Sequence, residues 1–255
     1  MAEVLEHPEM RSQLYSALAD IDRPLLLERS VKSIGPELRS GRFLISFPRA
    51  ALGPGPSRKF SEICRSLNAP ADGFCDIDDL QVKADVVHFG YEPEAGVELL
   101  KTYLEFKTPL KEQPKMRFFA LKWRQDGVWV HSKYTSCEDL GLDARKAILE
   151  THITAGPQCD VMVGLSEQVG PHASFLEVTE PGNPRVSVDL NLTAAPKRVG
   201  EMVDALQVFL GKQATAYMQE HRDDTVGHVS AGVARDGRAF SAVYHGAKFV
   251  HGELA

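Results

Sequence analysis

Polar and apolar residues alternate along several segments of the chain, which is the pattern of strands whose two faces meet different surroundings. In the segment ELLKTYLEFK, Lys101, Tyr103 and Glu105 share one face. Leu100 and Leu104 lie on the opposite face. The segments LLERSVKS and RVSVDLNL alternate in the same way. The pattern therefore predicts amphipathic strands rather than strands that are buried on both sides.

Turn residues divide these strands into hairpins, with helices between them. Asp126-Gly127 and Asp236-Gly237 are strong signals for tight turns. The predicted strands are 25–34, 41–50, 85–92, 98–107, 116–125, 128–136, 160–167, 173–180, 185–194 and the two arms of 228–246. The predicted helices are 9–20, 57–70, 138–152 and a long helix from Pro196, and residues 72–83 are predicted to be irregular.

Two arrangements fit these strands. An antiparallel sheet often has one packed face and one face in water. The polar faces of this chain, however, mix Tyr, Asn, Ser and His with single charges, and such a mixture suits a ligand-holding surface. We therefore predict an α+β fold, an antiparallel barrel of about ten strands surrounded by helices. Its polar face would line a solvent-filled lumen, because a dry core does not accommodate charges.

Length and charge narrow the classes of function. The 255 residues fit one barrel domain, 1–255, without a linker. The net charge of −6 argues against nucleic acid as the main ligand, because phosphate binding needs a basic face. The first residues predict no signal peptide, and no apolar run is long enough to cross a membrane. The four separated cysteines predict free thiols and a cytoplasmic protein, which we expect to be a monomer or weak dimer.

Several segments together resemble the ABBA-type (PT-barrel) prenyltransferases, and within them the branch that acts on ribosomal peptides, the cyanobactin prenyltransferases. LERSVKSI followed by SGRFLISF resembles the first two strands of that branch. VVHFGYEPEAGVELLKTYLEF resembles its next hairpin, which carries a Lys-x-(Tyr/His) pair. RVSVDLNL and GHVSAGVARDGRAFSAVYHG resemble its later strands.

The resemblance implies transfer of an isoprenyl group, commonly from dimethylallyl diphosphate, to a side chain of a ribosomally made peptide, either macrocyclic or linear. It also implies Mg²⁺, bound mainly through the diphosphate and without aspartate-rich motifs. The sequence is consistent with the absence of aspartate-rich motifs, because DDLQV and DDTVG both lack the final Asp of a DDxxD box. The nine histidines show no metal-binding spacing, so we expect no metal ligands from the protein itself.

Such a reaction needs cations and hydrogen-bond donors around the leaving pyrophosphate, aromatic faces beside the allylic cation and a base. Lys101 and Arg42 are the first candidates for the diphosphate, and Lys133 and Arg185 are weaker ones. Arg185 departs from the Arg-x-Lys-x-Tyr strand of related fungal enzymes, which puts its role in doubt.

Further candidates follow from the same chemistry. Tyr103 and Tyr244 are predicted to shield the cation or donate to the diphosphate, although a core tyrosine is an equal alternative. Glu28 is the candidate base if residues 25–34 are a strand, and a surface residue if they are a helix. The residues predicted to line the lumen or contact substrate are His88, Glu105, His131, Asp189 and Met162.

Two other functions remain open at this stage. The chain could prenylate a free aromatic metabolite rather than a peptide. It could also be a non-catalytic barrel that binds an apolar or phosphorylated ligand.

Overall fold

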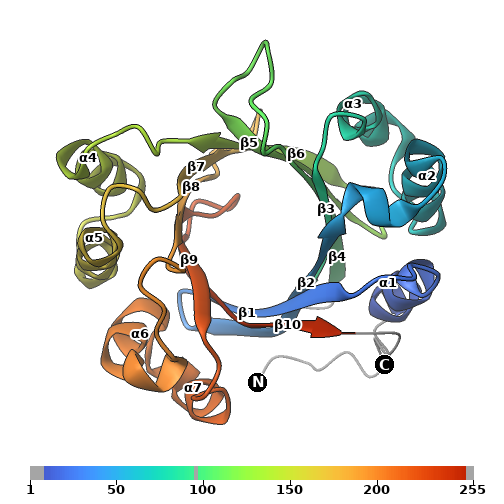
Figure 1. The fold of residues 1–255 in the computed structure, drawn as a ribbon. Coiled ribbons are helices and arrows are strands. Elements are labelled where there is room, and N and C mark those ends of the chain that lie inside the picture. The colour runs from blue at the N-terminus through green and yellow to red at the C-terminus, as the bar shows by residue number, and fades with distance from the viewer. Residues whose placement is uncertain (1–8, 95–96, 251–255) are drawn as a thin grey trace. The chain divides into compact units, whose positions relative to one another are not determined.

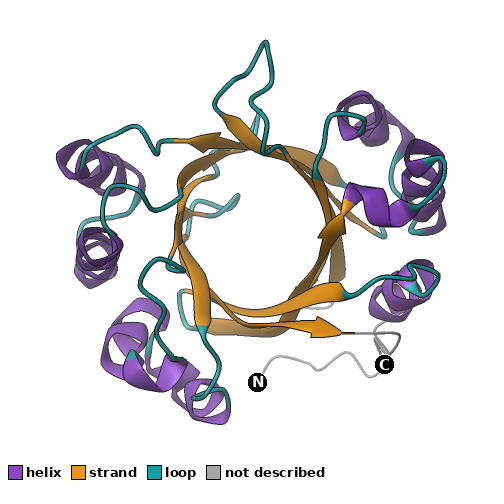
Figure 2. Cartoon of the chain, in the orientation of Figure 1, coloured by secondary structure: helices purple, strands orange, loops and turns teal. Residues whose placement is uncertain are grey.

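Ten antiparallel strands form a closed barrel in the computed structural model, which describes residues 9–94 and 97–250. The strand order is β1-β10-β9-β8-β7-β6-β5-β4-β3-β2, so each strand pairs with its neighbours in sequence and β1 also pairs with β10. Figure 2 shows the strands in orange and the helices in purple. The predicted fold class is confirmed.

The strands are β1 (Leu25–Ile34), β2 (Glu37–Pro48), β3 (Val86–Glu94), β4 (Val97–Glu105), β5 (Met116–Arg124), β6 (Trp129–Ser136), β7 (Phe175–Thr179), β8 (Val186–Asn191), β9 (Val226–Val233) and β10 (Ala239–Val250). The α-helices are α1 (Glu9–Leu18), α2 (Pro56–Ser66), α3 (Ala71–Gln81), α4 (Leu142–His152), α5 (Pro157–Val169), α6 (Val203–Leu210) and α7 (Thr215–Glu220). Short 3₁₀ helices are η1 (Arg49–Leu52), η2 (Val199–Glu201) and η3 (Lys212–Ala214).

Three predicted elements differ from the structure. Residues 71–81 form α3 rather than an irregular segment, with Ile77 buried on its inner side. Residues 157–169 form α5 rather than a strand, because Pro157 starts a helix after Gly156. The long helix predicted from Pro196 is divided into η2, α6, η3 and α7, and Gly211 ends α6 with a φ of 87°.

The described chain divides into two compact units, each with its own apolar core. Unit 1 comprises residues 1–27, 41–133 and 248–255, and unit 2 comprises residues 28–40 and 134–247. The prediction of a single domain stays a prediction.

The core of unit 1 lies between α1–α3 and one face of β2–β5, as the neighbouring blue and green elements of Figure 1 show. Phe89 of β3 stacks with Phe47 of β2 at 6.2 Å and lies 6.0 Å from Phe60 of α2. The indole N–H of Trp123 donates to the Leu67 carbonyl at 3.0 Å, which joins β5 to the end of α2. The apolar members of the alternating strands therefore face the helices.

The core of unit 2 has the same construction. Val188 and Leu190 of β8 belong to one buried cluster with Leu206 and Phe209 of α6. Figure 1 shows α4–α7 beside the strands of this unit. In both units the opposite, polar strand face is thus the inner face of the barrel, as the alternation predicted.

Within the described ranges, no helix has the length and hydrophobicity that a membrane span requires. The four cysteines are free thiols, of which Cys75 is exposed and the other three are buried.

Candidate functional site

A row of cations crosses the inner face of unit 1. Lys101 of β4 lies opposite Gly90 of β3 and Lys122 of β5 in the strand register. A Cβ at position 90 would approach the Leu44 side chain to 3.2 Å, so glycine keeps this row free of an additional side chain. Register and alternation therefore bring two lysines together from adjacent strands.

Glu92 links these cations to Arg42. Its carboxylate is 3.3 Å from the Arg42 Nε and forms an ion pair with the Lys101 ammonium. Arg42, Glu92, Lys101 and Lys122 are each at most 7% exposed. Three buried cations therefore lie beside the Glu92 carboxylate, and we call this group the cation cluster. The structure brings together the predicted Arg42 and Lys101, and it adds Lys122 and Glu92.

A second row on the same face holds His88. The Ser46 hydroxyl is 2.7 Å from the His88 Nδ1, and the Glu105 carboxylate is 3.1 Å from its Nε2. Burial alone would raise the pKa of Glu105, but the hydrogen bond and charge of His88 outweigh it and lower that pKa. Glu105 is therefore a carboxylate at neutral pH.

Aromatic rings surround His88. Tyr103 lies edge-on at 6.3 Å and Phe118 is tilted at 5.7 Å between ring centroids. The predicted Tyr103, His88 and Glu105 thus share one part of the inner face. Their rings offer the π faces that attract a positively charged carbon.

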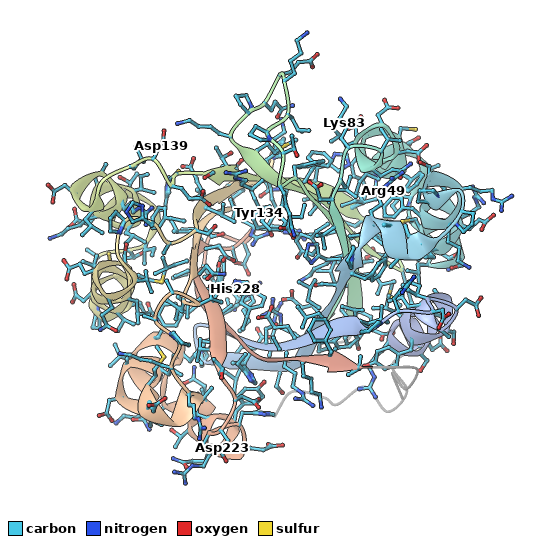
Figure 3. All side chains as sticks on the ribbon, in the orientation of Figure 1. Arg49, Lys83, Tyr134, Asp139, Asp223 and His228 are labelled. Carbon is cyan, nitrogen blue, oxygen red and sulfur yellow. The ribbon has the colours of Figure 1, made fainter. Side chains whose placement is uncertain are left out.

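The inner face of unit 2 carries His228 between two carboxylates, which we call the histidine site. The His228 Nδ1 is 2.8 Å from Asp189 Oδ1, and its Nε2 is 3.3 Å from Glu28 Oε2. The Tyr244 ring stacks on the imidazole at 3.8 Å with an interplanar angle of 12°. Figure 3 shows His228 on the side of β9 away from α6 and α7. Glu28 belongs to strand β1, so the helical alternative for residues 25–34 is excluded.

The two carboxylates decide the charge of His228. Burial alone would lower its pKa, but the negative charges of Asp189 and Glu28 outweigh burial and raise the pKa well above 6.5. The ring is therefore an imidazolium at neutral pH, with an N–H directed at each carboxylate. Any side chain at position 227 would meet the Glu28 Oε1 at 2.5 Å, so Gly227 makes room for this carboxylate.

Arg185 has a different environment. Its guanidinium bonds Glu180 at 2.5 Å and lies 5.6 Å from the centre of the Phe240 ring. Glu180 is fully buried and also accepts from Arg235 at 2.6 Å. Arg185 is thus part of a buried ion-pair network beside the turn between β7 and β8.

Three predicted lumen or diphosphate residues lie elsewhere. The His131 imidazole is 2.8 Å from the Gly73 carbonyl and 3.5 Å from Asp76, so it faces α3 rather than the inner face. Alternation along β6 places Lys133 on the same outer face as His131. Met162 lies on α5, fully buried in the core of unit 2. The predictions for His131 and Lys133 were wrong because these residues lie on the outer face of β6 rather than on the inner one. The prediction for Met162 was wrong because α5 was predicted to be a strand.

The sequence interpretation missed Lys122, Glu92 and His228. Lys122 and Ala120 lie on the same face of the segment MRFFALKWR. This alternation indicates which face Lys122 occupies, but it does not show that Lys122 lies opposite Lys101. His228 was assigned to the mixed hairpin without a role, because its carboxylate partners come from strands far apart in sequence.

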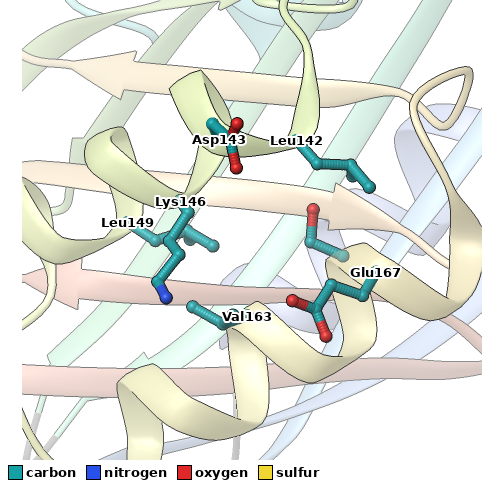
Figure 4. A pocket seen from close by; sticks show the side chains of 7 residues that line it. Leu142, Asp143, Lys146, Leu149, Val163 and Glu167 are labelled. Atoms are coloured by element: carbon teal, nitrogen blue, oxygen red, sulfur yellow. The ribbon is translucent and has the colours of Figure 1, made fainter.

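A small cavity between α4 and α5 is a weaker candidate for a site. Figure 4 shows Asp143, Lys146 and Glu167 at its edge. Its volume is about 30 Å³, which is space for water rather than for an organic ligand.

The strand order and the inner polar face give the chain the barrel fold of the ABBA prenyltransferases. Among solved structures, 5-dimethylallyltryptophan synthase from Streptomyces coelicolor is similar, with a TM-score of 0.60 and 12% identity over 86% of this chain and 80% of that one. AnaPT from Neosartorya fischeri has a TM-score of 0.58 and 13% identity over 90% and 79%. NotF prenyltransferase has a TM-score of 0.55 and 11% identity over 87% and 80%.

These likenesses establish the fold of the chain. No protein-family model matches the sequence, and neither does any curated protein sequence. The resemblance to the peptide branch of the family stays a prediction.

Proposed function

We propose that the chain transfers an isoprenyl group from an allylic diphosphate to an aromatic ring of a small acceptor. The observation that supports this most directly is the cation cluster on the inner face of a prenyltransferase-type barrel. The proposal takes the place of our first expectation, a ribosomal peptide acceptor.

The cation cluster suits the leaving group. When the allylic C–O bond breaks, the pyrophosphate takes both bonding electrons and the negative charge on its oxygens grows. Arg42, Lys101 and Lys122 are nearly dehydrated, and a fixed cation in such surroundings stabilises developing negative charge more than it does in water. Diphosphate would compete with Glu92 for these cations, so Glu92 would keep them in place before the donor binds.

The aromatic rings and the carboxylates suit the remaining steps. The allylic carbon forms a new bond to a ring carbon of the acceptor, and that ring carbon then loses its proton. Tyr103 and Tyr244 stay the predicted aromatic shield of the cation, and Glu28 stays the predicted base. Tyr103 belongs to unit 1, whereas Tyr244 and Glu28 belong to unit 2. Within unit 2, the Glu28 Oε2 bonds His228. The imidazolium of His228 would hold this carboxylate in position, and Asp189 would hold the imidazolium.

Magnesium does not fit a site made by the inner-face carboxylates. Mg²⁺ prefers oxygen ligands in octahedral geometry. Among the described inner-face carboxylates, Glu92 bonds Arg42 and Lys101, Glu105 bonds His88, and Glu28 and Asp189 bond His228. We therefore propose that any Mg²⁺ enters on the diphosphate oxygens, and no step above depends on it.

The acceptor class is proposed from the neighbouring structures. One is described as 5-dimethylallyltryptophan synthase with DMASPP and Trp, another as PriB with L-tryptophan and dimethylallyl thiolodiphosphate, and a third as NotF with brevianamide F and DMSPP. These acceptors favour a free aromatic compound over a ribosomal peptide.

The test is prenyl transfer followed by mass spectrometry. The full chain is incubated with dimethylallyl diphosphate, Mg²⁺ and one of tryptophan, indole, tyrosine or short peptides that contain Trp or Tyr. We expect one isoprenyl unit to be added to a free aromatic acceptor. Lys101→Ala is expected to slow turnover by about 100-fold, the effect typical of losing one group that stabilises an anion. Lys107→Ala is the matched control, because Lys107 is exposed and follows the end of the same strand.

Binding of inorganic pyrophosphate separates the alternatives. Thermal stabilisation of the wild type by pyrophosphate, lost in Lys101→Ala, with no product from any acceptor would indicate a non-catalytic barrel. Product from peptides alone would restore the peptide acceptor. Equal turnover by Lys101→Ala and Lys107→Ala would reject the cation cluster as the diphosphate site.

A further inference from the structure

Two histidines and an aspartate gather on the outer side of unit 2, away from the histidine site. His221 follows the last residue of α7, and Asp224 lies in the short loop after it. His245 comes from β10, where the pairing register with β9 shifts between Tyr244 and His245. Figure 3 labels Asp223, the neighbour of Asp224, beside α7.

Both imidazoles lie close to the same carboxylate oxygen, Oδ2 of Asp224. Asp224 Oδ2 is 2.8 Å from the His245 Nδ1 and 3.3 Å from the His221 Nδ1. One ligand atom from each residue lies within 4.8 Å of the others. Ligands of a tetrahedral Zn²⁺ ion, about 2.0–2.1 Å from the metal, lie roughly 3.3 Å from one another, so small side-chain movements reach that geometry.

The surroundings orient these ligands. The Tyr217 hydroxyl is 2.8 Å from the His245 Nε2, on the opposite edge of the ring from Asp224. When Nε2 carries the proton and donates to this hydroxyl, Nδ1 presents a lone pair towards Asp224. Metal-binding histidines are commonly held by such a bond on the second nitrogen. His245 is 1% exposed, so its ring has little freedom to turn away.

The backbone also leaves space for the carboxylate. Gly246 has a φ of 63°, and a Cβ there would lie 2.6 Å from Asp224 Oδ2. A larger residue at this position would therefore displace the shared ligand. The site is partly open, since the side chains of His221 and Asp224 are 18% and 27% exposed.

We propose that His221, Asp224 and His245 bind Zn²⁺, with water in the fourth position. Two imidazole nitrogens and one carboxylate oxygen are a donor set that suits Zn²⁺ and not Mg²⁺. The ion would cross-link the end of α7 and the following loop to β10, because its ligands come from all three segments. This proposal is independent of the prenyl-transfer function. The proposal departs from our expectation of no metal ligands from the protein itself, which rested on sequence spacing, because His245 joins the other two residues only through the fold.

The test measures metal binding by the full chain. The protein is first treated with a chelator, and Zn²⁺ is then titrated in by calorimetry while thermal unfolding is followed in parallel. We expect one strong Zn²⁺ site and, with Zn²⁺ well above the Kd, a rise in Tm of about 5 °C. Mg²⁺ at the same concentration is expected to produce neither effect. Co²⁺ in place of Zn²⁺ is expected to give the absorption of a tetrahedral site with nitrogen and oxygen ligands.

The variants are His221→Ala and Asp224→Asn, chosen because both side chains are partly exposed and their loss disturbs the core less than loss of buried His245. Both are expected to lose Zn²⁺ binding and the rise in Tm while retaining the circular dichroism of the wild type. His172→Ala removes an exposed histidine outside the cluster, and Cys75→Ser removes the exposed thiol. Both controls are expected to bind like the wild type.

Any of three results would overturn the proposal. One is a wild type that binds no Zn²⁺ above background. The second is unchanged Zn²⁺ affinity in His221→Ala and Asp224→Asn, and the third is loss of the site in Cys75→Ser. If either metal-site variant unfolds, the Co²⁺ spectrum of the wild type still decides the matter, because thiolate ligands or octahedral coordination would contradict the assigned donor set.

Discussion

At the scale of single residues, His228 is bonded to one carboxylate at each ring nitrogen, Asp189 at 2.8 Å and Glu28 at 3.3 Å. An imidazolium so placed stabilises the fold as long as it keeps its charge. Because its pKa is raised above the unfolded value of 6.5, its contribution is fully present below about pH 6.5 and is lost as the pH rises through the higher, folded-state pKa.

We expect the difference in Tm between wild type and His228→Gln to be largest near pH 6 and to shrink as the pH increases towards alkaline values. Glutamine keeps a polar side chain but cannot carry the charge. Thermal unfolding at a series of pH values measures this, and NMR titration of the His228 ring gives its pKa directly. An imidazole pKa at or below 6.5 would contradict the explanation.

The sequence was informative about residues where only alternation was needed. Lys101, Tyr103 and Glu105 were placed on one face, and that face is the inner one. The partners of these residues could not be read from the sequence, because they depend on the register between strands. Lys122 meets Lys101 across β4 and β5, and His228 meets Glu28 across 200 positions of sequence.

At the scale of elements, the pairing of β8 with β9 depends on a close approach of two backbones. Gly232 lies opposite Ser187, and a Cβ on Gly232 would contact the Val186 carbonyl oxygen and come within 2.5 Å of the Ser187 Cα. Backbone atoms within a sheet cannot move aside as a flexible side chain can. By contrast, a Cβ on Gly164, within α5, would meet nothing within 4 Å.

We expect Gly232→Ala to lower the free energy of unfolding by about 3 kcal/mol, the upper part of the usual range for overpacking. Gly164→Ala is its matched control and is expected to raise the same quantity by about 0.5–1 kcal/mol, because alanine restricts the unfolded chain and favours helix. Denaturant unfolding of both variants measures the two changes. A Gly232→Ala chain as stable as the wild type would show that β8 and β9 separate readily.

Most hairpins could be predicted because turn residues and alternation act locally. Helix α5 could not, since Val161 and Val163 in DVMVGLSE fit both a strand and a helix. The helix follows from its start at Pro157 and from the burial of Met162 and Leu165 in the core of unit 2. Tertiary packing thus decided between two local possibilities.

At the scale of the whole molecule, the last strand completes unit 2. Val243 of β10 lies opposite Val229 of β9 and belongs to the core of this unit. We expect a chain that ends at Arg238 to lose cooperative unfolding, because β9 would keep an open edge and part of that core would be exposed. Thermal unfolding followed by near-ultraviolet circular dichroism measures this, and a sharp transition like that of the full chain would contradict it.

The division of the chain between its two units also governs when each unit can be finished during synthesis. Unit 1 begins with residue 1 but also includes residues 248–255, and unit 2 combines residues 28–40 with 134–247. Neither unit corresponds to an uninterrupted stretch that emerges early from a ribosome. We therefore expect unit 2 to form only after residues 226–247 have been made, so its apolar strand residues stay exposed for longer than those of a contiguous domain.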